Sequence, residues 1–78
     1  MTDPTALATA LATAAADEGL RLTPDDITYI ADEVAAGLDT TDHPDELMLV
    51  VDHALTCCGV DVDLAVAERI ATHLIRSI

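Results

Sequence analysis

The chain is short, acidic and aliphatic: its 78 residues include fifteen Asp and Glu but only three Arg and no Lys, so the formal net charge is -12. This balance argues against direct binding to nucleic-acid phosphates, which depends on Lys and Arg, and against attraction to an anionic membrane surface. The hydrophobic fraction of 51% is rich in Ala, with one Tyr and no Phe or Trp, so residues 1–78 are expected to form one domain with a small aliphatic core.

The acidity has two interpretations. It permits a partner with a basic surface, but a Lys-free composition rich in Asp and Ala is also what a GC-rich genome or a high-salt cytoplasm produces. No basic stretch followed by an apolar stretch marks a signal peptide, and no apolar run approaches about 18 residues, the length of a membrane span. We therefore expect a cytoplasmic protein that does not enter a membrane.

The first predicted helix covers residues 4–18. Asp3 can cap its start and Pro4 suits its first turn, while Gly19 marks its end. The inner face of this helix is only weakly apolar and consists of Leu7, Leu11, Ala14 and Ala15.

The second predicted helix covers residues 24–36. Thr23 is its expected cap. Asp25 and Asp26 place negative charge at the positive end of the helix dipole, and Gly37 is expected to end the helix. The buried face repeats at helical spacing and consists of Ile27, Ile30, Ala31 and Val34.

The third predicted helix covers residues 44–58 and contains the densest run of large apolar side chains, residues 47–51. We expect this helix to be the central one, with the others folded around it. Pro44 suits its first turn, and Gly59 can take the left-handed conformation that ends it. Leu49 falls on the opposite, polar side. The buried face consists of Leu47, Val50, Val51, Ala54, Leu55 and Cys58.

The last predicted helix covers residues 63–77, with Asp61 or Asp63 as its cap. It carries two apolar stripes where the core of one domain needs one, and we expect the second to bury against another copy or a partner. The first stripe consists of Val66, Ile70 and Leu74, and the second of Leu64, Ala71, Ile75 and Ile78. The basic flank, which is expected to meet carboxylates within the fold or across an interface, consists of Arg69, His73 and Arg76.

Together these elements predict an all-α fold, a small four-helix bundle without a sheet. An offset of forty residues aligns Pro4 with Pro44, Leu7 with Leu47, Gly19 with Gly59, and Ile30 with Ile70. Such an alignment allows the bundle to consist of two tandem helix-turn-helix hairpins. The residues expected to be buried together are Leu47, Val51, Ile27, Ile30, Val34 and Ile70.

Residues that could carry chemistry are few. His53 and Cys57 share one helix flank at i, i+4 spacing, but structural zinc is four-coordinate and no second ligand pair has suitable spacing. A bridge between the neighbours Cys57 and Cys58 would be strained, so both are expected to be free thiols. Their place at the negative end of a helix dipole raises the thiol pKa. We therefore predict no metal, no cofactor and no catalytic residue, so the protein is expected not to be an enzyme.

The surface favours binding over catalysis. Tyr29 faces away from the buried side of its helix within an acidic field, where it is either a contact residue or a ring lying on a solvated surface. The candidate protein-interface residues are Tyr29, Leu49, Leu64, Ala71, Ile75 and Ile78.

The working hypothesis is a non-enzymatic acidic helical protein that binds a protein partner with a basic or apolar surface and forms a symmetric homodimer or a larger homo-oligomer. An adaptor, a chaperone-like holder or a small regulator encoded by a phage or other mobile element would fit. The alternative is an acidic nucleic-acid mimic that occupies the basic cleft of a DNA- or RNA-binding protein and inhibits it. A metal-binding regulator is a third hypothesis.

Overall fold

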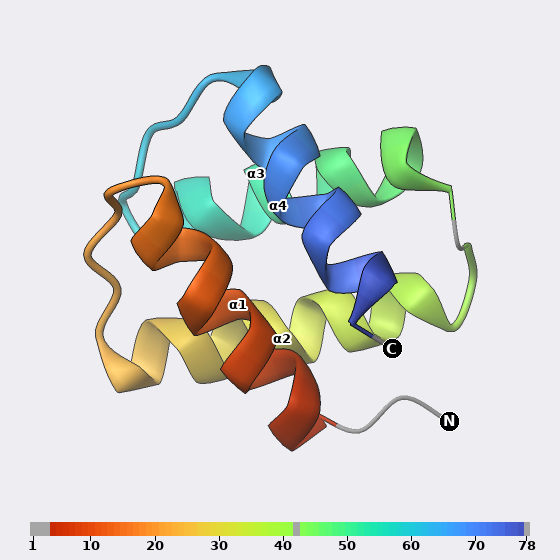
Figure 1. The fold of residues 1–78 in the computed structure, drawn as a ribbon, viewed down its shortest axis with the longest axis horizontal. Coiled ribbons are helices and arrows are strands. Elements are labelled where there is room, and N and C mark those ends of the chain that lie inside the picture. The colour runs from red at the N-terminus through yellow and green to blue at the C-terminus, as the bar shows by residue number, and fades with distance from the viewer. Residues whose placement is uncertain (1–3, 42, 78) are drawn as a thin grey trace.

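Four α-helices account for most of the computed structural model, which describes residues 4–41 and 43–77 (Figure 1). They are α1 (Pro4–Asp17), α2 (Pro24–Leu38), α3 (Pro44–Cys57) and α4 (Leu64–Arg76). No strand occurs in these two segments, and none of the four helices is both long and apolar enough to cross a membrane. The predicted all-α four-helix bundle is confirmed, and each predicted helix end lies within two residues of the observed one.

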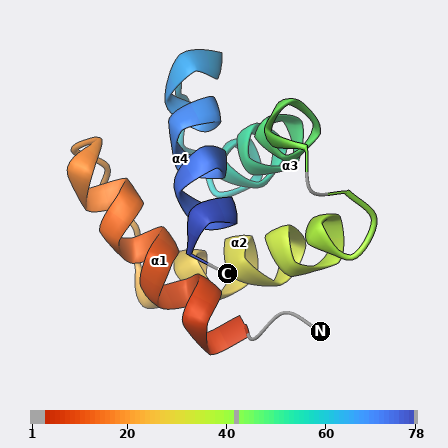
Figure 2. The ribbon, with the colours of Figure 1, turned by 45° about the vertical axis from the view of Figure 1, so that its right-hand side comes forward.

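The helices pack as a closed ring. The contacting pairs are α1 with α2, α2 with α3, α3 with α4, and α4 with α1. Figures 1 and 2 show α1 and α4 in one layer and α2 and α3 in the other. The prediction that the third helix is central is therefore wrong, because each helix turns one apolar side to a shared centre and none is surrounded.

The start of α2 shows how local sequence places a helix end. The hydroxyl Oγ1 of Thr23 accepts a hydrogen bond from the backbone N–H of Asp26 at 3.1 Å, and Oδ2 of Asp26 accepts one from the N–H of Thr23 at 3.3 Å. This reciprocal capping box satisfies two N–H groups that the helix cannot pair internally, and it confirms Thr23 as the cap. Asp63 occupies the corresponding position of α4 without a side-chain hydrogen bond, while Asp3 lies outside the described residues.

Two glycines end α1 and α3 in the same way. Gly19 and Gly59 have φ values of 75° and 79°, in the left-handed region that residues with a Cβ rarely adopt. The next N–H then turns back onto the helix: Leu20 donates to the carbonyl of Ala15, and Val60 donates to that of Leu55, each at 2.9 Å. These hydrogen bonds satisfy carbonyls in the last helical turn.

Gly37 has a different role from the predicted one. It was expected to end α2, but the helix continues through Leu38 to a cap at Asp39. A Cβ at position 37 would lie 3.3 Å from Cδ1 of Leu47 and 3.3 Å from Cγ2 of Val50. Gly37 therefore permits α3 to approach the last turn of α2 closely.

The core at the centre of the ring is wholly apolar, and among the described residues no polar or charged residue is buried. Five of the six residues predicted to share it are fully buried, whereas Ile27 is only partly buried at its edge. The largest fully buried side chains come from all four helices and are Leu7, Leu11, Ile30, Val34, Leu47, Val51, Leu55, Ile70 and Leu74.

The two halves of the chain repeat at an offset of forty residues. Helices start at positions 4 and 44 and again at positions 24 and 64, and the two glycine turns carry equivalent backbone hydrogen bonds. A shift of forty residues aligns α1 with α3 and α2 with α4. Under this exchange of helices, each contacting pair becomes another contacting pair of the ring. The chain is therefore two tandem helical hairpins, α1–α2 and α3–α4, with the same local architecture.

Candidate functional site

The outward side of α2 carries the only aromatic residue of the chain, Tyr29. Its side chain is 41% exposed. The neighbours that share this side recur at i, i+3, i+4 and i+7 spacing, and all are exposed. We call this set the α2 face, and it consists of Asp25, Thr28, Tyr29, Asp32, Glu33 and Ala36. It contains three carboxylates and no cationic side chain.

A polar cluster connects the α2 face to the end of α3. Cys57 at the end of α3 raises the pKa of Tyr29, and the negative charge of Glu33 raises it further. Sγ of Cys57 lies 3.6 Å from Nε2 of His53, one helical turn earlier. The pairing of His53 with Cys57 follows from their spacing, but the approach of Tyr29 from another helix could not be read from the sequence.

The two neighbouring thiols are free, with Cys57 exposed and Cys58 half-buried. Burial raises the pKa of Cys58, and the carboxylate of Asp26 raises it further. The direction for Cys58 agrees with the prediction, although burial rather than the helix dipole is the main cause. A thiol held in its protonated form is a poor nucleophile. In the described segments no three His, Cys, Asp or Glu residues are placed to hold a metal ion.

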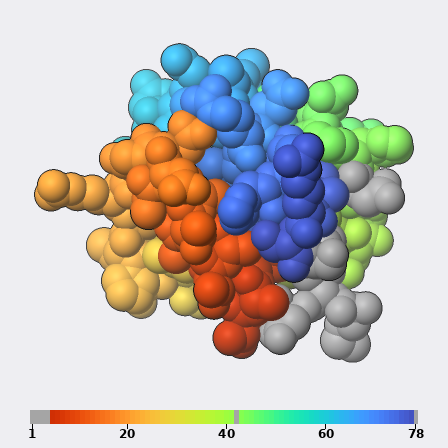
Figure 3. Space-filling model, viewed as in Figure 1, coloured from red at the N-terminus to blue at the C-terminus, as the bar shows by residue number. Residues whose placement is uncertain are grey.

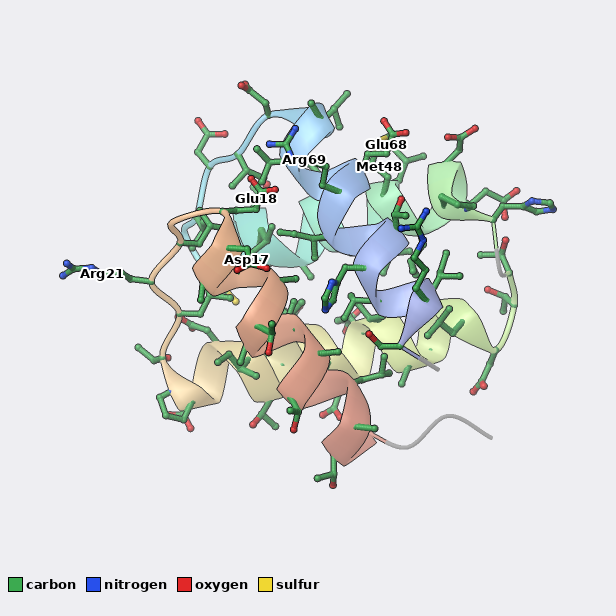
Figure 4. The ribbon with its side chains drawn as sticks, in the orientation of Figure 1. Asp17, Glu18, Arg21, Met48, Glu68 and Arg69 are labelled. Carbon is green, nitrogen blue, oxygen red and sulfur yellow. The ribbon has the colours of Figure 1, made fainter. Side chains whose placement is uncertain are left out.

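On another side of the molecule, a bidentate salt bridge between Arg69 and Glu18 connects α4 to the end of α1 (Figure 4). Nε of Arg69 donates to Oε1 of Glu18 at 2.6 Å, and Nη2 donates to Oε2 at 2.9 Å. This hydrogen bonding lowers the pKa of Glu18 and raises that of Arg69. The expectation that the basic flank meets carboxylates is confirmed for Arg69. Within the described part of the chain, Arg21 and Arg76 form no ion pair, and Figure 4 shows Arg21 pointing away from the helices.

An open hollow of about 470 Å³ runs along the outward side of α4. A smaller hollow of about 110 Å³ continues beside it between α1 and α4, next to Asp17 and Glu18. Figure 3 shows α1 and α4 side by side on this surface. We call the residues that line the larger hollow the α4 face, and they are Ala65, Glu68, Arg69, Thr72, His73 and Arg76. It holds three of the six Arg and His residues of the chain.

The other predicted interface residues differ in how much of each side chain is exposed. Leu49 on α3 and Leu64 at the start of α4 are 58% and 52% exposed. Ala71 is fully buried, so its assignment to a free apolar stripe is wrong. Because α4 packs against both α3 and α1, the core takes parts of both apolar stripes. Ile75 is partly buried against that core, and Ile78 lies outside the described residues.

Sequence reasoning named the basic residues of α4 but did not identify the α4 face as a surface hollow. The signal that could have found it is the forty-residue offset, which makes this face the counterpart of the α2 face. Comparison of the chain with models of protein families, with curated proteins and with solved structures gives no match. Function therefore has to be inferred from the residues and geometry of this chain.

Proposed function

We propose that this protein is a non-enzymatic, cytoplasmic binding protein that recognises a basic protein surface through its α2 face. The observation that carries the proposal is the exposure of six neighbouring positions with three carboxylates, no cation and Tyr29 among them. The proposal includes adaptor, chaperone-like and regulatory roles. The free thiols support a reducing compartment.

Charge and the aromatic ring would contribute differently to this recognition. The carboxylates of the α2 face, added to a net charge of -12, attract a basic partner and raise its association rate. The ring of Tyr29 supplies a rigid anchor, because Tyr is enriched among the residues that dominate binding energy. The exposed large apolar side chains in the described segments, Tyr29, Leu49 and Leu64, lie on three different helices. A basic partner is therefore better supported than an apolar one.

Nucleic-acid mimicry is the alternative, and the average charge density of the same carboxylates supports it. From Asp25 to Glu33 the helix rises about 12 Å, and the face carries three carboxylates over that length. One DNA strand carries a phosphate roughly every 3.4 Å, so the two linear charge densities are similar. The partner of a mimic would be a DNA- or RNA-binding protein, and nucleic acid would compete with this chain for it.

The proposal can be tested by photocrosslinking in the native host. A photoreactive amino acid at position 36 samples the α2 face, and one at position 16 on α1 replaces another exposed helical Ala as the control. We expect capture of a protein with a basic surface from position 36 only. The captured protein, once purified, should bind the Asp32→Asn/Glu33→Gln double variant about tenfold more weakly than the parent chain.

Calorimetric titration of the purified partner with each chain measures the two affinities. Equal affinities for the parent chain and the double variant would contradict recognition through the α2 face. If nucleic acid displaces the chain from the purified partner, the mimic is favoured over the adaptor, chaperone-like and regulatory roles.

A further inference from the structure

The α2 face and the α4 face are equivalent surfaces of the two hairpins. Adding forty to each of the six positions of the α2 face gives the six positions of the α4 face. Both helices belong to hairpins whose starts and turns match at this offset. Because α2 and α4 are not neighbours in the ring, the two faces are on separate sides of the molecule. One chain therefore presents two helical surfaces of the same spacing at the same time.

The two equivalent faces differ in charge. Where the α2 face has Tyr29, Glu33 and Ala36, the α4 face has Arg69, His73 and Arg76. The α4 face carries one carboxylate, Glu68, at the position equivalent to Thr28. Arg69 is already engaged by Glu18. Arg76 forms no ion pair within the described chain, so its guanidinium is the strongest cationic feature that this surface offers to a carboxylate on another molecule.

We infer that the α2 face of one copy packs into the hollow along the α4 face of a second copy. The carboxylates of Asp32 and Glu33 would then approach the guanidinium of Arg76, which can hydrogen-bond a carboxylate with two N–H groups. The ring of Tyr29 would lie against this open surface of α4, where it can stack on that guanidinium. The inference deepens the proposed function, since it names a second copy as one partner of the α2 face.

The contact is heterologous, because two different faces meet. A pair of molecules then retains one free α2 face and one free α4 face, so further copies can add until a ring closes. This differs from the symmetric homodimer expected from the sequence. The net charge of -12 opposes assembly, but at physiological salt the repulsion is screened beyond about 8 Å, while charges in direct contact are screened less. We therefore expect a weak contact that depends on concentration.

Two variants can separate the two faces. Arg76→Glu alters only the α4 face, and Asp32→Asn with Glu33→Gln alters only the α2 face, all at exposed positions. By sedimentation at physiological salt and concentrations up to about 1 mM, each variant alone should remain at the monomer mass of 8.2 kDa. Their equimolar mixture should contain a species of twice that mass and nothing larger, since only one pair of intact faces remains. The parent chain should form the larger species as well.

A matched control is Arg21→Glu, which makes the same charge change outside both faces and should assemble like the parent chain. Self-association of the Asp32→Asn/Glu33→Gln variant would overturn the inference, because it would indicate a symmetric contact between α4 faces. A parent chain that stays at 8.2 kDa throughout would also overturn it. Arg76→Glu keeps the α2 face intact, so a basic partner should still bind it, and failure of assembly can be distinguished from failure of the proposed function.

Discussion

At the scale of single residues, the Glu18–Arg69 pair is the one ion pair in the described part of the chain. It joins residues 51 positions apart in sequence and ties the two hairpins together where α1 ends. At the equivalent place in the other repeat, positions 58 and 29 are Cys58 and Tyr29. Tyr29 therefore lies near the end of α3, where Cys57 raises its pKa, at the place where the other interface has an ion pair.

The ion pair makes stability depend on pH in a predictable direction. Its hydrogen bonds lower the pKa of Glu18 below the usual value of a Glu carboxyl group, so the folded state favours the charged carboxylate more than the unfolded state does. The resulting stability is fully present above the unfolded pKa and is lost as pH falls through the folded pKa. Glu18→Gln should therefore lower Tm at pH 7 and have little effect at the acidic end of the range.

Melting curves of the parent chain and Glu18→Gln between pH 7 and pH 2.5 measure this difference. Asp17→Asn is the matched control, because it removes a neighbouring carboxylate that has no ion pair in the described segments. A Tm difference for Glu18→Gln that stays constant across the pH range would show that the ion pair is not its source.

At the scale of the helices, the local signals that end a helix disagree with the packing between helices at one position, Gly37. Pro residues at the first helical positions of α2 and α3 and glycine turns after α1 and α3 place most helix ends where the sequence alone predicts them. Gly37 departs from this pattern, because the approach of α3 fixes the residue type there. A glycine was thus mistaken for a terminator when it serves close helix packing.

Replacing Gly37 tests which effect dominates. Ala favours a helix interior by about 1 kcal/mol over Gly, but its Cβ would press on Leu47 and Val50 at 3.3 Å. Overpacking typically costs about 1–3 kcal/mol, and Leu47 is fully buried with little room to move. We expect Gly37→Ala to lower the free energy of unfolding by about 1 kcal/mol. Urea unfolding measures it, and a variant more stable than the parent chain would show that α3 yields at this contact.

At the scale of the whole molecule, one apolar centre holds all four helices. The core has no aromatic side chain and is built from Leu, Ile, Val and Ala, so its stability is spread over many modest contributions. Small domains of this length have little stability to spare. A single buried charge is therefore expected to unfold the protein.

Val51→Asp is the direct test of this core. Val51 is fully buried in α3, and an unpaired carboxylate there lacks the solvation that it has in the unfolded chain. We expect the cooperative thermal transition to disappear, as followed by far-ultraviolet circular dichroism. Leu49→Asp is the control on the same helix, because Leu49 is 58% exposed, and it should melt close to the parent chain. Similar melting of both variants would contradict the assigned burial.

The sequence by itself determined the fold class and the positions of the helices. Caps, first-turn prolines and glycine turns act within about one helical turn, and apolar spacing marks the inward side of each helix. These signals need no knowledge of where other helices lie. They also placed Tyr29 and Leu49 on the surface, because a residue opposite a buried stripe is solvated in any packing of that helix.

Only the tertiary structure decided how the helices meet. The closed ring buries parts of both apolar stripes of α4, including Ala71, and the sequence could not show that α4 has two neighbours. The ring likewise selects Glu18 for Arg69 and brings Tyr29 to Cys57, because an acidic chain offers many carboxylates and local spacing favours none of the distant ones. The α4 face is the side of α4 that neither neighbour covers.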